Sequence, residues 1–99
     1  MKDYSSAIYF FTLSIEENPD RCENYYNRAY AYIYTNNYEK SILDLNQAIK
    51  LNKNYSDAYY NRGLLYMRLH KIEEARRDFS KAGELGIKFA YKIINELSN

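Results

Sequence analysis

The sequence predicts an all-α protein built of antiparallel helix hairpins that repeat every 34 residues. Only three glycines and one proline interrupt the 99 residues and valine is absent, so the turn and β-branched residues typical of an all-β domain are scarce. Apolar residues recur at the i, i+3, i+4, i+7 spacing of amphipathic helices. A shift by 34 positions superimposes the "YYNR" of Tyr25–Arg28 on that of Tyr59–Arg62, and such a fixed period is the signature of a repeat architecture.

The single domain is predicted to divide into four segments. Residues 1–21 form a partial repeat with the back helix only, because the 34-residue shift aligns them with the second half of a later copy. Residues 22–55 and 56–86 form full repeats, each with a front and a back helix. Residues 87–99 form a C-terminal capping helix, whose apolar stripe covers the last hairpin.

Polar and conformationally special residues mark the expected helix ends. Asp20 and Asn54 precede acidic first turns and are expected to cap the two front helices. The polar segments 35–37 and 69–71 supply the turns of the two hairpins. Gly86 is expected to end the last back helix in a left-handed conformation.

The apolar stripes of the two full copies share one spacing. On each front helix a tyrosine is followed by a small residue four positions on and a second tyrosine three further on. With the matching back-helix positions, the stripe is Tyr25, Ala29, Tyr32, Ser41, Leu45 and Ala48, then Tyr59, Gly63, Tyr66, Ala75, Phe79 and Ala82. This pattern and the period of 34 resemble the tetratricopeptide repeat. The resemblance implies an alpha-alpha superhelix, a core made of these residues and a role in protein interaction.

Two arginines depart from the family's pattern. Arg28 and Arg62 stand at a packing position where the family has leucine, and a buried charge without a partner is costly. Antiparallel helices bring Arg28 opposite Asp44 and Arg62 opposite Asp78 if each hairpin turns midway between them. We expect structural ion pairs at both places, and anion binding by the arginines is the alternative.

A second stripe on each front helix, about 100° from the first, resembles the concave partner-binding surface of the family. Tyrosine suits such a surface because its ring offers apolar area and its hydroxyl tolerates water. The alternative is that these side chains only cover the neighbouring helix. The predicted groove residues are Glu23, Tyr26, Asn27, Tyr30 and Tyr34 in the first copy and Asp57, Tyr60, Asn61, Leu64, Met67 and Arg68 in the second.

The groove residues also predict which partners bind. Some members of the resembled family grip a carboxylate-terminated chaperone tail with lysine, arginine and asparagine. The matching positions here hold Glu23, Asp57, Tyr26 and Tyr30, and only asparagine is retained. Acidic tails are therefore expected to bind poorly, and apolar or basic-aromatic segments are expected to bind better.

The sequence thus predicts a protein-binding scaffold module rather than an enzyme, with no cofactor and no metal. His70 and Cys22 are single residues of their type and the three glycines are scattered, so no metal site, catalytic relay or phosphate-binding loop is expected. Fourteen basic and thirteen acidic residues are interleaved, which disfavours nucleic acid. A membrane partner is not expected, since no apolar run approaches the ~20 residues of a membrane span. We expect an intracellular, cytoplasmic protein.

The first helix supports a rival function, that of a structural spacer or self-assembly segment excised from a longer repeat array. Part of its apolar surface is expected to stay uncovered, because no helix precedes it. A homodimer through this helix would cover that surface. The predicted self-association residues are Tyr4, Ile8, Phe10 and Phe11.

Overall fold

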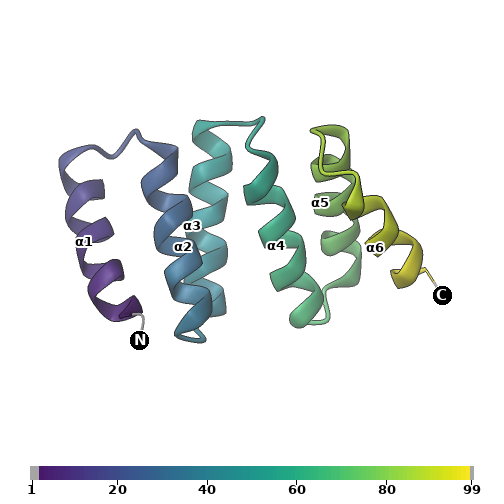
Figure 1. Cartoon of the computed structure of the whole chain (residues 1–99), viewed down its shortest axis with the longest axis horizontal. Coiled ribbons are helices and arrows are strands. Elements are labelled where there is room, and N and C mark those ends of the chain that lie inside the picture. The colour runs from purple at the N-terminus through teal and green to yellow at the C-terminus, as the bar shows by residue number, and fades with distance from the viewer. Residues whose placement is uncertain (1–2, 99) are drawn as a thin grey trace. The chain divides into compact units, whose positions relative to one another are not determined.

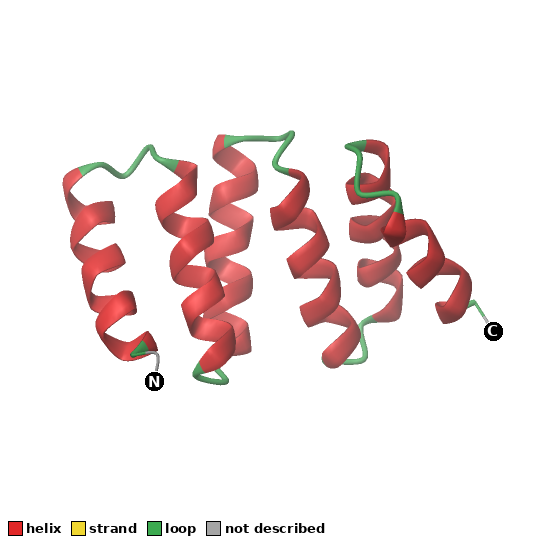
Figure 2. Cartoon of the chain, in the orientation of Figure 1, coloured by secondary structure: helices red, strands yellow, loops and turns green. Residues whose placement is uncertain are grey.

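A computed structural model describes residues 3–98, which form six α-helices and no strand (Figure 1 and Figure 2). The helices are α1 (Tyr4–Glu17), α2 (Cys22–Tyr34), α3 (Tyr38–Leu51), α4 (Ser56–Arg68), α5 (Ile72–Glu84) and α6 (Phe89–Leu97). The expected all-α class is confirmed. The chain divides into two compact units, Met1–Lys53 with α1 to α3 and Asn54–Asn99 with α4 to α6.

In the first unit, α2 and α3 form an antiparallel hairpin and α1 packs on α2. The small residue Ala29 of α2 and the back-helix residues Ser41, Leu45 and Ala48 are almost fully buried, as the apolar stripe predicts. The Ser41 hydroxyl donates to the Ala29 carbonyl oxygen at 2.8 Å, which satisfies the buried polar group and brings the two backbones close together.

In the second unit, α4 and α5 form the equivalent hairpin and α6 packs on α5. The core of this unit consists of Ala75, Phe79, Ala82, Ala90 and Ile93. Two of these residues, Ala90 and Ile93, belong to α6, so the last helix closes the apolar side of α5.

The ends of three helices share one turn geometry. Asn36, His70 and Gly86 have left-handed backbone conformations, with φ of 61°, 62° and 116°. The amide of the residue that follows each of them donates to the carbonyl oxygen five positions back, at 2.8 to 2.9 Å. This hydrogen bond ends the preceding helix and redirects the chain. The left-handed conformation predicted for Gly86 is confirmed.

The capping residues predicted for the front helices are wrong. The N-cap residues of α2 and α4 are Arg21 and Tyr55, one position after Asp20 and Asn54, and neither makes a capping hydrogen bond through its side chain. Each helix still begins with an acidic residue in its first turn, which is favourable near the positive end of the helix dipole. The helix dipole therefore contributes to the start of both helices.

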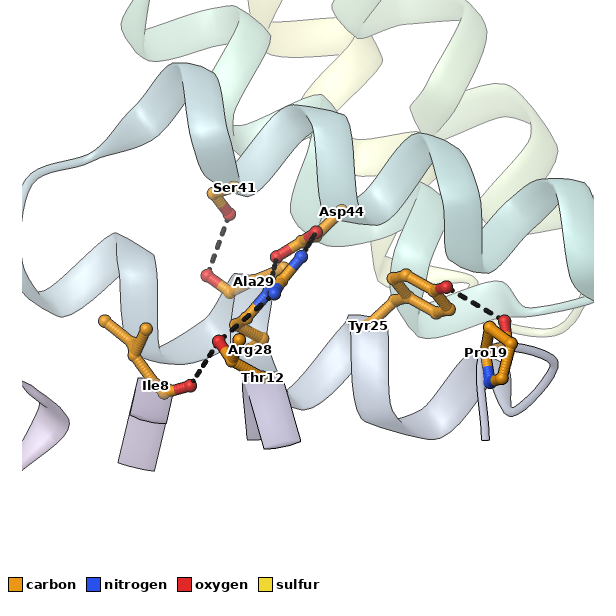
Figure 3. Close-up of polar contacts among 8 residues, drawn as sticks. All are labelled: Ile8, Thr12, Pro19, Tyr25, Arg28, Ala29, Ser41 and Asp44. Carbon is orange, nitrogen blue, oxygen red and sulfur yellow. Dashed lines mark hydrogen bonds and ion pairs between the residues drawn. The ribbon is translucent and has the colours of Figure 1, made fainter. Parts of the chain in front are cut away.

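The two predicted ion pairs are confirmed, and their geometry is the same in both hairpins. Arg28 Nε and Nη2 donate to Asp44 Oδ2 and Oδ1 at 2.8 and 2.7 Å, and Arg62 makes the same two bonds to Asp78 (Figure 3 shows the first pair). The aspartates are only 5% and 4% exposed. Each arginine is thus held by a two-point contact that joins a front helix to its own back helix.

The first arginine also fixes α1. Arg28 Nη1 donates to Thr12 Oγ1 at 3.2 Å, and the Thr12 hydroxyl donates to the Ile8 carbonyl oxygen at 2.7 Å (Figure 3). The guanidinium lies 5.8 Å from the centre of the Tyr32 ring. One side chain therefore connects all three helices of the unit.

We predict that Asp44→Ala destabilises the chain by about 2–3 kcal/mol, because it leaves a mostly buried guanidinium without its carboxylate. The double variant Arg28→Met with Asp44→Leu should recover most of that loss, since it removes both charges together. Urea denaturation followed by circular dichroism measures the free energies. Glu73→Ala is the control, since it breaks an exposed 3.8 Å contact with Arg76 and should cost under about 1 kcal/mol. Equal losses for Asp44→Ala and Glu73→Ala would contradict the assignment.

At one equivalent contact between front and back helix, the two hairpins pair residues of different size. Ala29 and Leu45 in the first hairpin correspond to Gly63 and Phe79 in the second. A Cβ atom added to Gly63 would lie 2.9 Å from Phe79 Cε1, which is closer than carbon atoms pack. The absent methyl group of Gly63 therefore makes room for the larger ring.

We predict that Gly63→Ala destabilises the second unit by about 1–3 kcal/mol through this overlap. Adding Phe79→Leu recreates the Ala29–Leu45 combination, so the double variant should lose about 1 kcal/mol less than the sum of the single variants. Thermal and urea unfolding of the unchanged chain, the two single variants and the double variant completes the double-mutant cycle. Strict additivity would mean that the ring and the glycine do not constrain each other.

Candidate functional site

The predicted groove residues of the first unit lie on one exposed side of α2, which we call the α2 face: Glu23, Tyr26, Asn27, Tyr30 and Tyr34. Tyr30 and Tyr34 are 44% and 52% exposed, Tyr26 is half-buried, and Glu23 and Asn27 are exposed. Two aromatic rings thus present a large part of their surface to solvent from one helix.

The exposed tyrosines of the α2 face are held in a fixed arrangement. The Tyr30 and Tyr34 hydroxyls are 3.2 Å apart, and their ring centres are 5.1 Å apart. Tyr34 also stacks on Tyr4 of α1, with ring centres 4.6 Å apart and planes 7° from parallel. The structure therefore brings Tyr4, a predicted self-association residue, to the α2 face. Sequence analysis missed this contact, although the antiparallel packing of α1 on α2 was a signal for it.

The predicted groove residues of the second unit form the α4 face: Asp57, Tyr60, Asn61, Leu64, Met67 and Arg68. Asp57 and Arg68 are exposed and the others are half-buried. Tyr60, Leu64 and Met67 pack against the core of the unit. The Tyr60 and Phe79 rings meet edge to face, with their centres 5.8 Å apart. The α4 face is therefore less exposed than the α2 face, and three of its residues also contribute to packing.

Few charged groups lie on these two faces. The α2 face carries Glu23, and the α4 face carries Asp57 and Arg68. The other arginines of α2 and α4, Arg28 and Arg62, are engaged by buried carboxylates. The hydrogen bond with the partner aspartate raises the pKa of each of these guanidinium groups. Both cations are thus committed to the hairpins, which disfavours the alternative of anion binding.

In the second ion pair, the pKa of the carboxyl group reflects both its burial and the arginine beside it. Burial raises the pKa of the Asp78 carboxyl, and the hydrogen bonds and charge of Arg62 oppose that rise. The arginine beside it therefore favours the charged form of the carboxylate. This is a structural role, because both groups satisfy each other inside the hairpin.

The candidate metal-ligating and nucleophilic residue types were followed through the described part of the chain. Within residues 3–98, no group of three or more His, Cys, Asp or Glu side chains is placed to hold a metal ion. Burial and the neighbouring Glu23 raise the pKa of the Cys22 thiol, which makes it a weak nucleophile. His70 lies in a turn, as predicted. No helix in the described part of the chain is long and apolar enough to cross a membrane.

The four predicted self-association residues do not share one exposed surface. Tyr4, Ile8 and Phe11 are half-buried, whereas Phe10 is 63% exposed. Phe10 therefore belongs to a different side of α1 from the Tyr4 ring that stacks on α2.

Comparisons with known proteins agree with this architecture. A family model described as "TPR repeat" matches residues 29–70, and one described as "Tetratricopeptide repeat" matches residues 56–86. No curated protein sequence gives a significant match.

Solved structures of similar fold cover nearly the whole chain. The first TPR of Spaghetti (RPAP3), bound to the HSP90 peptide SRMEEVD, is 31% identical with a TM-score of 0.89, and the match covers 96% of this chain and 77% of that one. The second TPR domain of human RPAP3, in complex with the HSP70 peptide SGPTIEEVD, is 33% identical with a TM-score of 0.87, covering 97% and 82%. MamA is 26% identical with a TM-score of 0.91, and this chain spans 56% of its length.

Proposed function

The chain belongs to the tetratricopeptide repeat family. From this premise we propose that it binds a peptide or a partner helix through the tyrosine-lined α2 face of the first unit, and that the α4 face is the matching surface of the second unit. The observation that carries the proposal is the tyrosine cluster of the α2 face, in which Tyr30 and Tyr34 stay exposed while Tyr4 stacks behind them. The proposal places the chain in the cytoplasm as a scaffold module, as its single cysteine favours.

The arrangement of the tyrosines favours binding over mere coverage of a neighbouring helix. A tyrosine that is fixed by ring stacking and by a hydroxyl contact loses little conformational freedom when a partner binds. Tyrosine is also among the residues that dominate binding energy at protein interfaces. Asn27 adds an exposed amide one turn before Tyr30, where it can hydrogen-bond to the backbone of a ligand.

The charges favour a partner that is not acidic. The HSP90 peptide bound by the first TPR of Spaghetti, SRMEEVD, holds three acidic residues. The α2 face offers no lysine or arginine to such a peptide, and Glu23 repels it. Tyrosine rings instead attract cations at their faces, so a segment with an apolar or aromatic anchor beside a lysine or arginine suits this surface.

We predict that Tyr30→Ala with Tyr34→Ala weakens binding of a basic-aromatic peptide by about tenfold or more. The peptide is the strongest binder from an array of such segments, and titration calorimetry gives its affinity. Stability should change by less than about 1 kcal/mol, because both rings are largely exposed. Leu43→Ala is the matched control, since Leu43 is 67% exposed on α3 and is not part of the α2 face. Unchanged affinity in the double tyrosine variant would refute the proposal.

We further predict that SRMEEVD binds this chain more weakly than the same peptide with lysine at its three acidic positions and an amidated end. The reason is the charge of the α2 face, which favours cations over carboxylates. Fluorescence anisotropy with labelled peptides at low and at physiological salt measures both affinities. Micromolar binding of the acidic peptide, with no gain for the lysine peptide, would show that the assignment of charge preference is wrong.

A second candidate function is assembly of the chain with copies of itself or with neighbouring repeats, as a structural spacer. It is favoured by the exposed ring of Phe10 on α1. In this alternative the main contacts lie at the end of the repeat array, and the α2 and α4 faces have no ligand.

A further inference from the structure

All the side chains of the α2 face end in a polar group. Glu23, Asn27, Tyr30 and Tyr34 are exposed, and Tyr26 is half-buried. No aliphatic side chain belongs to this face, so it lacks the row of apolar anchors that holds an amphipathic helix in a groove. The face instead combines aromatic rings with hydrogen-bonding groups.

The hydrogen-bonding groups of the α2 face can donate to the backbone of a ligand. The exposed amide of Asn27 carries N–H donors. The Tyr30 and Tyr34 hydroxyls are 3.2 Å apart, so Tyr30 keeps its own hydrogen for a ligand when it accepts from Tyr34. A helical ligand uses its carbonyl oxygens in internal hydrogen bonds, whereas a polyproline II segment has no internal hydrogen bonds and offers them. These donors therefore suit an extended ligand.

The exposed rings favour proline within such a ligand. Tyr30 and Tyr34 are 44% and 52% exposed, and their ring centres lie 5.1 Å apart. Proline-rich segments in the polyproline II conformation dock on surfaces lined by aromatic rings. Proline has no backbone N–H that needs an acceptor, and its fixed backbone lowers the entropic cost of binding. A proline ring packed on this tyrosine pair meets both requirements.

The charges place a basic residue at one end of the ligand. Glu23 lies in the first turn of α2, and the last turn of α1 lies at the same end of the first unit (Figure 1). Residues 16–23 include four acidic side chains and one basic side chain, so this end attracts a cation. Along the helix axis, Glu23 is about 10 to 17 Å from the tyrosine pair. A polyproline II segment covers that distance in roughly three to five residues.

We propose that the α2 face binds a proline-containing segment in the polyproline II conformation. A proline of the segment packs on Tyr30 and Tyr34, and Asn27 donates to a carbonyl oxygen of its backbone. A lysine or arginine, roughly three to five residues from that proline, lies beside Glu23. This inference rests on the proposed function, because it names the class of ligand that the same face takes.

Matched probe peptides test the inference against the full chain by fluorescence anisotropy. One probe combines proline and alanine with a single arginine, and a second probe has alanine at every proline position, so length and charge stay the same. Each probe is made with the arginine at either end, because the acidic end of the face can meet either chain direction. The proline probe should bind about tenfold tighter than its alanine counterpart. Replacing the arginine by glutamine should weaken the proline probe at low salt and have less effect at high salt.

The tyrosine hydroxyls distinguish an extended ligand from a helical one. Tyr30→Phe with Tyr34→Phe keeps both rings and removes both hydroxyls, so the proline probe should bind about threefold or more weakly. A helical ligand would bind this variant at least as tightly as the unchanged chain, because its backbone needs no donor. Asn27→Ala should weaken the proline probe in the same way. Leu43→Ala, at an exposed position of α3 outside the α2 face, is the matched control and should leave its affinity unchanged.

Two results would overturn the inference while the proposed function holds. One is that the proline and alanine probes bind equally, although Tyr30→Ala with Tyr34→Ala still weakens the basic-aromatic peptide. The other is that the double phenylalanine variant binds the proline probe as tightly as the unchanged chain does, which would show that the face does not recognise backbone carbonyl oxygens. If neither the proline probe nor the basic-aromatic peptide loses affinity in the double alanine variant, the proposed function and the inference both fail.

Discussion

The structure depends on one contact that each hairpin repeats, the two-point ion pair between an arginine of the front helix and an aspartate of the back helix. Arg28 with Asp44 and Arg62 with Asp78 have the same atoms and distances in the two units. The pair sits where most hairpins of this family place a leucine, so it introduces a charge that only its partner can satisfy. Register between the two helices is thereby fixed, because a shift by one residue would leave both charges buried and unpaired.

This use of the arginines has a consequence for the outer surface. With Arg28 and Arg62 engaged inside the hairpins, the α2 face is left with tyrosines, an asparagine and one acid. A related domain of 31% identity binds an acidic HSP90 peptide, whereas the α2 face of this chain carries no basic side chain. The same fold can therefore present a different chemistry to its partner, since a family fixes a scaffold and the exposed residues decide what binds.

The period of 34 residues made the hairpins, their small core residues and the Arg–Asp pairs predictable, because each copy supports the reading of the other. The N-cap positions of α2 and α4 were predicted one residue too early, since both helices begin one residue later than the capping pattern indicates. The stack of Tyr4 on Tyr34 was missed, because the stripes were compared within each copy and this contact joins two helices that belong to different copies. The contact of Tyr60 with the Phe79 ring, which lies against Gly63, was also not predicted, because an apolar pattern does not show how far a large ring reaches.

The central claim is that the exposed tyrosines of the α2 face form the surface that meets a partner. The most direct test is an NMR titration of the labelled chain with its strongest basic-aromatic peptide. The account predicts shift changes at Tyr26, Asn27, Tyr30 and Tyr34, with further changes along the α4 face. Shift changes confined to α1 or to the outer side of α3 around Leu43, with no shift change on the α2 and α4 faces, would contradict it.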